Sequence, residues 1–152
     1  MQEGQIVSLL ELCRTGQFGK LKIGSSEREM TTFLGEPTGW GVDSTPGETY
    51  CHYGDVQFFF HNTNNLYLIH IDWFSGKNHA PILNKPHQLE SWVLHGDANQ
   101  ETIKSALHSA SLPFQTESKF GSIVLKLESN VEIAFSSDTC ELYAISVLLR
   151  SR

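Results

Sequence analysis

Hydrophobic and polar residues alternate in two separate parts of the chain. The alternating runs span residues 48–53, 56–61, 66–73, 122–128, 131–136 and 142–149. Alternation with a period of two residues is typical of a β-strand that is buried on one side only. The pattern therefore predicts three antiparallel strands in each part of the chain.

A helical pattern precedes each group of strands. Ser26 and Glu29 have the spacing of a capping box, and Asp97 and Gln100 have the same spacing. Apolar residues then recur three and four positions apart, which predicts one buried stripe on each helix. A further helix with its own apolar stripe is expected at residues 5–13.

The two parts also match each other in order along the sequence. Residues 66–71 resemble residues 142–147, and residues 56–60 resemble residues 131–135. The short turns before the second strand of each part, Gly54-Asp55 and Ser129-Asn130, coincide as well. We therefore predict a tandem duplication of one unit, a helix followed by a three-stranded meander.

These matches divide one domain into segments. We expect an N-terminal helix within residues 1–17, a first repeat at 18–74, a linker at 75–91 and a second repeat at 92–149. A chain of 152 residues has the length of a single domain. The predicted fold class is α+β, with the strands of both repeats in one continuous six-stranded sheet and the helices packed on one face. Joining the repeats edge to edge would hide one exposed edge in each.

The tight turn at Gly54 and Asp55 determines which residues of the first repeat lie side by side. It pairs His52 with Gln57, and the following loop pairs Gln57 with His70. One face of these strands is apolar and is expected to pack on the helices. The other face is expected to carry Tyr50, His52, Gln57, Phe59, His61, Leu68, His70 and Asp72.

This polar and aromatic face has three interpretations. It can be a half-solvated sheet surface, or a protein-binding surface, since interface cores favour aromatic residues. It can also be a metal site, although His52 and His70 would lie about 9–10 Å apart at the backbone. The matching row in the second repeat is predicted to be Leu127, Glu132 and Ser146, so the metal-binding chemistry is not repeated.

The charge and the cysteine content of the chain bear on which partners and which cellular compartment we expect. Seventeen acidic and eleven basic side chains give a net charge of -6, and no cluster of Lys and Arg occurs, which disfavours nucleic acid. No apolar stretch reaches the roughly 18–20 residues that a membrane span needs, and the start does not resemble a signal peptide. The three cysteines have no short spacing, so we expect reduced thiols in a cytoplasmic protein.

Motifs for catalysis or cofactor binding do not occur. The sequence has no G-x-S-x-G elbow, P-loop, H-E-x-x-H or C-x-x-C. We interpret Gly39-Trp40-Gly41 as a turn that Trp40 anchors. Solvated or capping roles are expected for the remaining histidines, which are His79, His87, His95 and His108. We therefore predict no enzyme activity, no cofactor and no metal.

The segments Ile23-Gly-Ser-Ser-Glu-Arg-Glu-Met30, Phe33-Leu-Gly-Glu-Pro37 and Tyr53-Gly-Asp-Val56 resemble the small α+β unit of the SmpA/OmlA outer-membrane lipoprotein family. A tandem pair of such units resembles the β-lactamase inhibitor protein architecture, in which the repeats form one concave sheet. The resemblance implies a bacterial scaffold that binds proteins through its sheet face. The chain departs from both groups in its cysteines, with neither a lipidation cysteine nor the inhibitor's cysteine pairs, so localisation and partner do not transfer.

The leading hypothesis is a non-enzymatic protein-binding module, of the bacterial immunity or inhibitor kind. Its predicted binding face consists of Tyr50, His52, Gln57, Phe59, His61, His70 and Asp72. The alternative is an enzyme that binds a metal or small ligand through His52, His70 and Asp72. A third possibility is a structural subunit or homodimer.

Overall fold

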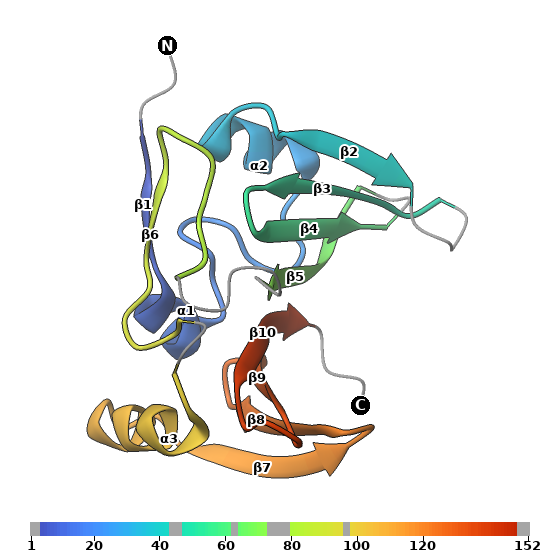
Figure 1. The fold of residues 1–152 in the computed structure, drawn as a ribbon. Coiled ribbons are helices and arrows are strands. Elements are labelled where there is room, and N and C mark those ends of the chain that lie inside the picture. Colours follow the sequence, from blue (N-terminus) through green and yellow to red (C-terminus); the bar gives the residue numbers. More distant parts are fainter. Residues whose placement is uncertain (1–3, 43–46, 62–63, 73–79, 96–97, 149–152) are drawn as a thin grey trace.

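The computed structural model describes residues 4–42, 47–61, 64–72, 80–95 and 98–148. Within them the chain forms an α+β fold (Figure 1). The helices are α1 (Leu9–Thr15), α2 (Glu27–Leu34) and α3 (Gln100–Ser109), none of them long and apolar enough to cross a membrane. The strands are β1 (Ile6–Ser8), β2 (Gly39–Val42), β3 (Thr49–Tyr53), β4 (Val56–Phe60), β5 (Leu66–Asp72), β6 (Gln88–Glu90), β7 (Phe114–Lys119), β8 (Ser122–Leu127), β9 (Val131–Ser136) and β10 (Leu142–Leu148). Outside the described residues lie the predicted positions Trp73, Asp97 and Leu149 and linker residues 75–79.

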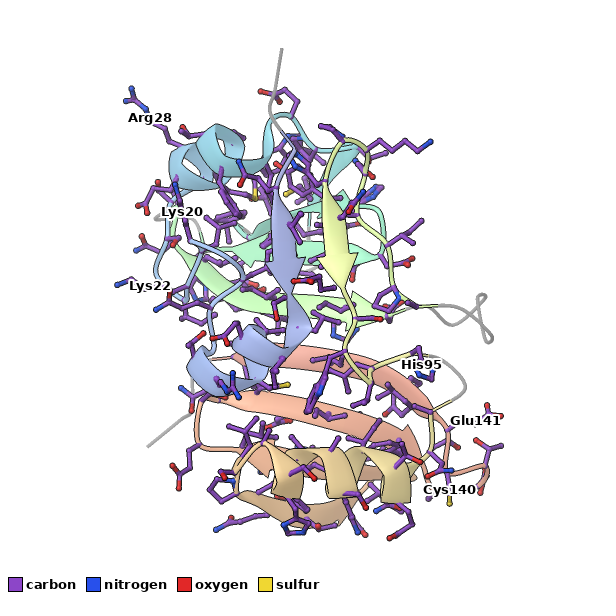
Figure 2. The ribbon with its side chains drawn as sticks, turned by 90° about the vertical axis from the view of Figure 1, so that its left-hand side faces the viewer. Lys20, Lys22, Arg28, His95, Cys140 and Glu141 are labelled. Carbon is purple, nitrogen blue, oxygen red and sulfur yellow. The ribbon has the colours of Figure 1, made fainter. Side chains whose placement is uncertain are left out.

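Eight of the strands form one antiparallel sheet in the order β2-β3-β4-β5-β10-β9-β8-β7. Each half of this sheet consists of four strands that follow one another in the chain, and the halves meet where β5 pairs with β10. The helices and the small β1–β6 pair lie on one side of the sheet; Figure 2 views the molecule from that side. A single continuous sheet was predicted correctly, but six strands were too few.

Within the eight-stranded sheet, the two strands that the sequence pattern missed, β2 and β7, are its edge strands. The segment Gly39-Trp40-Gly41 is not a turn, because it pairs along β3 as the first part of β2. Gly41 lies opposite Tyr50, whose ring covers it so closely that a Cβ at Gly41 would come within 2.5 Å of Tyr50 Cζ. An aromatic ring folded over a glycine in this way compensates for the missing side chain of an edge strand. The other missed strand, β7, is mostly exposed and shows no apolar alternation.

The N-terminal helix was predicted correctly for only part of its length. Ser8 accepts a hydrogen bond from the Glu11 N–H at 3.1 Å and so fixes the start of α1 at the next residue. The preceding residues are extended, and β1 pairs in parallel with β6. The predicted linker therefore contains a strand, and that strand holds the start of the chain beside it.

The predicted N-terminal cap is confirmed for α2 and wrong for α3. The capping box of α2 is confirmed, since Ser26 Oγ accepts from the Glu29 N–H at 3.0 Å and Glu29 Oε1 accepts from the Ser26 N–H at 3.4 Å. The N-cap of α3 is Asn99, whose Oδ1 accepts from the Thr102 N–H at 2.9 Å. The cap predicted two residues earlier was wrong, because Asn99 occupies the N-cap position and satisfies one free N–H of the first turn.

The hydrophobic core lies between the helices and the apolar face of the sheet. Phe18 packs edge-on against Phe58 of β4, with ring centroids 5.4 Å apart. Met30 of α2 meets Cys51 of β3, with 3.5 Å between the sulfur atoms. Burial raises the pKa of the Cys13 thiol to about 12, and burial together with Glu27 raises that of Cys51 to about 12. Both buried thiols are therefore protonated at neutral pH and inert.

Of the two roles expected for His87, the solvated one is wrong because the residue is buried, whereas its contact with the last carbonyl of α2 is a capping role. The side chain is 4% exposed. Its Nδ1 accepts the Gln5 N–H at 3.0 Å, and its Nε2 lies 2.7 Å from the Leu34 carbonyl oxygen, to which it donates. This tautomer follows from the two partners, since a backbone N–H can only donate and a carbonyl can only accept. The ring ties the linker to the start of the chain and to the end of α2.

Candidate functional site

The side of the eight-stranded sheet that faces away from the helices, called the open face below, carries all seven residues of the predicted binding face. The predicted register is confirmed at its centre, where Gln57 lies between His52 on β3 and His70 on β5. The same row continues into the second half of the sheet, because His70 lies opposite Ser146 on β10. A row of polar side chains thus crosses the junction between the two halves.

The second half of this row differs from the prediction. Glu132 lies opposite Lys126, not Leu127, which is 1% exposed and belongs to the core. The prediction assumed a two-residue turn, but residues 128–130 form a three-residue loop between β8 and β9. Asn130 closes this loop with a φ of 71°, a conformation that asparagine tolerates. The extra residue shifts the pairing by one position.

Four rings form a continuous cluster on the open face of the first half. Tyr50 stacks on Phe59, with centroids 5.4 Å apart and an interplanar angle of 28°. Phe59 contacts Tyr67 at 6.3 Å, and Tyr67 stacks on His61 at 4.0 Å. We call these four residues the aromatic cluster. Such offset arrangements are the preferred geometry of aromatic pairs.

Two members of this site were not found from the sequence. Tyr67 was predicted on the core side, but a bulge in the β4–β5 pairing sets Phe60 opposite Leu66, so Leu66 enters the core and Tyr67 turns to the open face. Glu48 was not predicted to take part. Its carboxylate accepts the Tyr67 hydroxyl proton at 3.0 Å and lies 3.2 Å from His61 Nδ1, which fixes both rings. The clue would have been the alternation itself, because Glu48 begins the predicted run 48–53 and lies two residues before Tyr50, on the same face.

His70 joins two other side chains, Asp72 and Ser146, at the junction of the two halves. Its Nε2 lies 3.3 Å from Asp72 Oδ2, and its Nδ1 lies 2.8 Å from Ser146 Oγ. Because a carboxylate only accepts, the tautomer that fits both partners carries its proton on Nε2 and accepts the Ser146 hydroxyl proton at Nδ1. His70 and Asp72 are partly exposed, at 27% and 29% of their side-chain surface. The result is a carboxylate–imidazole–hydroxyl chain that solvent can reach.

The open face is acidic, since its four carboxylates outnumber the two lysines of its outer strands, Lys119 and Lys126. Lys126 Nζ lies 2.6 Å from Glu117 Oε2, and this hydrogen bond lowers the pKa of the Glu117 carboxyl. The carboxylates on this face are Glu48, Asp72, Glu117 and Glu132. Among the described residues, no three His, Cys, Asp or Glu side chains are placed to hold a metal ion.

The sequence matches no protein-family model and no curated protein. The structure is similar to the crystal structure of a DUF4309 family protein, YjgB, from Bacillus subtilis subsp. subtilis str. 168. The two share 13% sequence identity and a TM-score of 0.56, and the match covers 93% of each chain. At this identity the similarity concerns the fold alone.

Proposed function

We propose that this protein is a non-enzymatic binding module that recognises another protein through its open face, in the manner of an immunity or inhibitor protein. The observation that carries the proposal is the aromatic cluster, which lies partly exposed beside a polar row on a face turned away from the helices. Interface centres are rich in Tyr, Trp and Phe, and polar side chains around them set the register of the partner.

The aromatic cluster is also pre-ordered. Tyr50 is held between Gly41 and Phe59, and the Glu48 carboxylate holds Tyr67 and His61. Ordering a free side chain on binding costs about 0.5–1.5 kcal/mol, so rings that are already fixed lose less on association. A partner that covers this cluster gains apolar burial without that cost.

A duplicated unit is part of the proposal. The sheet order is symmetric about the β5–β10 pair, and a helix precedes the four-stranded run in each half. The unit is then a helix followed by four strands. Its core positions are apolar in both halves, whereas the open faces differ, with Gln57 and His52 in one and Glu132 and Lys126 in the other. This divergence favours a binding function specific to the first half.

The enzyme alternative rests on the chain from Asp72 through His70 to Ser146. This order of groups is that of a nucleophilic triad, in which the imidazole takes the serine proton. An acyl-transfer site also needs donors for the oxyanion, whereas the backbone of β10 is paired on both sides and the Glu132 carboxylate lies opposite Ser146. A negative charge there would oppose an oxyanion, so we favour binding over catalysis.

The test begins with immobilised protein and an extract of the source organism. Retained proteins are identified by mass spectrometry, and the strongest candidate is purified and titrated by calorimetry. The triple variant Tyr50→Ala, Phe59→Ala, His70→Ala should weaken binding at least 30-fold, since one interface hot spot is worth about 2 kcal/mol or more.

A matched control uses the helical side of the molecule. The variant Glu101→Ala, Ser105→Ala changes exposed residues of α3 and should bind the partner like the wild type. Circular dichroism confirms that all variants keep the fold. Equal binding by the triple variant, or retention of no protein at all, would contradict the proposal.

A further inference from the structure

A second site lies on the helical side of the molecule, away from the open face. A pocket of about 400 Å³ opens between α2, residues 20 and 21, and Gln5 at the start of the chain. Leu21 and Phe33, which are 1% and 9% exposed, provide the apolar part of its lining. A pocket of this size falls within the range that accommodates a small organic ligand.

The rim of this pocket is basic, in contrast to the acidic charge of the whole chain. Lys20 and Arg28 line it, and Lys22 lies on the same border of the molecule (Figure 2). None of these three side chains forms an ion pair with any residue that the structure describes. Two of the eleven Lys and Arg residues therefore line the pocket, and a third lies on the same border of the molecule.

The lining also holds one acid, Glu29, so its charged side chains are two cations and one carboxylate, with a positive balance. Glu29 Oε1 lies 3.4 Å from both the N and the Oγ of Ser26, so its carboxylate is used in the capping box of α2. The long stems of Lys20 and Arg28 add apolar surface beside the Phe33 ring while their charged ends remain in water. The pocket thus combines a small apolar floor with a lining of net positive charge.

We infer that this pocket binds a small organic anion with an apolar body, such as a short fatty acid or an aromatic carboxylate or sulfonate. The apolar body would contact Phe33 and Leu21, and the anionic group would accept charge-assisted hydrogen bonds from Lys20 and Arg28. A neutral molecule of the same shape gains only the apolar contact, and an inorganic anion gains only the charge contact.

Fluorescence titration with 8-anilinonaphthalene-1-sulfonate tests this inference on the full chain. The dye should bind saturably at one site, and octanoate should displace it, whereas 1-octanol at the same concentration should not. Replacing either cation, by Lys20→Gln or Arg28→Gln, should weaken dye binding about fivefold, and the double variant about 25-fold.

Two controls make the result decisive. Lys104→Gln removes a cation from α3, far from the pocket lining, and should leave dye affinity unchanged. Lys20→Arg with Arg28→Lys keeps both charges and should retain affinity within about twofold, which also detects a folding defect in the neutral variants. Unsaturable dye binding, equal displacement by octanol, or unchanged affinity in the double glutamine variant would overturn the inference.

Discussion

His87→Ala tests how strongly one buried side chain holds the linker and the start of the chain in place. The substitution leaves the Gln5 N–H and the Leu34 carbonyl without the partners that they have at 3.0 and 2.7 Å. A buried polar group without a partner costs about 1–3 kcal/mol. Water can enter the space left by the ring and replace part of the lost hydrogen bonding. We therefore expect the free energy of unfolding to fall by about 3 kcal/mol in total.

This loss is large beside the roughly 5–15 kcal/mol by which a domain is stable. For a chain of this length it corresponds to a fall in Tm of about 6–12 °C. Urea unfolding followed by circular dichroism gives the free energy, and a thermal melt gives Tm. His87→Gln, whose amide can both accept and donate, should lose less than His87→Ala.

The matched control is His108→Ala. His108 is an exposed residue of α3 that contacts the Phe114 ring at 5.4 Å, so its removal should change stability by no more than about 0.5 kcal/mol. If His87→Ala is as stable as the control variant, the two hydrogen bonds do not hold the linker, and the role assigned to His87 is wrong.

Four further predictions concern the thiols, the aromatic cluster and the serine. Iodoacetamide at pH 8 should label Cys140 alone in the native protein and all three cysteines in urea, as counted by mass spectrometry, because Cys13 and Cys51 are buried. Burial raises the pKa of Cys13 and Cys51 from 9.0 to about 12, so their contribution to stability is intact below pH 9 and lost between pH 9 and 12, as urea titrations at several pH values would show. Gly41→Ala should push Tyr50 away from its position over β2 and weaken partner binding, whereas Gly39→Ala, whose new Cβ would lie 3.3 Å from His52 Nε2, should have the smaller effect; equal calorimetric affinities would contradict this. A fluorophosphonate probe should not modify Ser146, and labelling that disappears in both Ser146→Ala and His70→Ala would favour the enzyme alternative over binding.

The sequence was a good guide wherever local chemistry determined the structure. The capping box at Ser26 and the tight turn at Gly54 rest on neighbouring residues, so both could be predicted, and the turn then fixed the pairing of His52, Gln57 and His70. The alternation of hydrophobic and polar residues predicted six of the strands, because the apolar residues of these strands face the core.

The sequence-based predictions were wrong where residues far apart in the chain determine the local structure. β2 is a strand because Tyr50 and His52 cover its glycines, and those contacts cannot be seen in the glycine-rich segment itself. The extra loop residue before β9 moved Lys126 into the polar row, and a bulge moved Tyr67 to the open face. Ser146 could not be joined to His70 from sequence, because that contact depends on how β5 and β10 align.

The pairing of β1 with β6 has a consequence for the order in which the molecule can form. Ile6 lies beside Gln88, so a chain emerging from the ribosome must expose the whole first meander before its first strand finds a partner. Contacts between such distant residues slow folding, because the loop must close before they stabilise anything. Until His87 is synthesised, the Leu34 carbonyl lacks its hydrogen-bond donor. The first half therefore packs fully only against residues that are synthesised after it. A chain truncated after β5 should be cleaved readily by proteases until the missing residues are added.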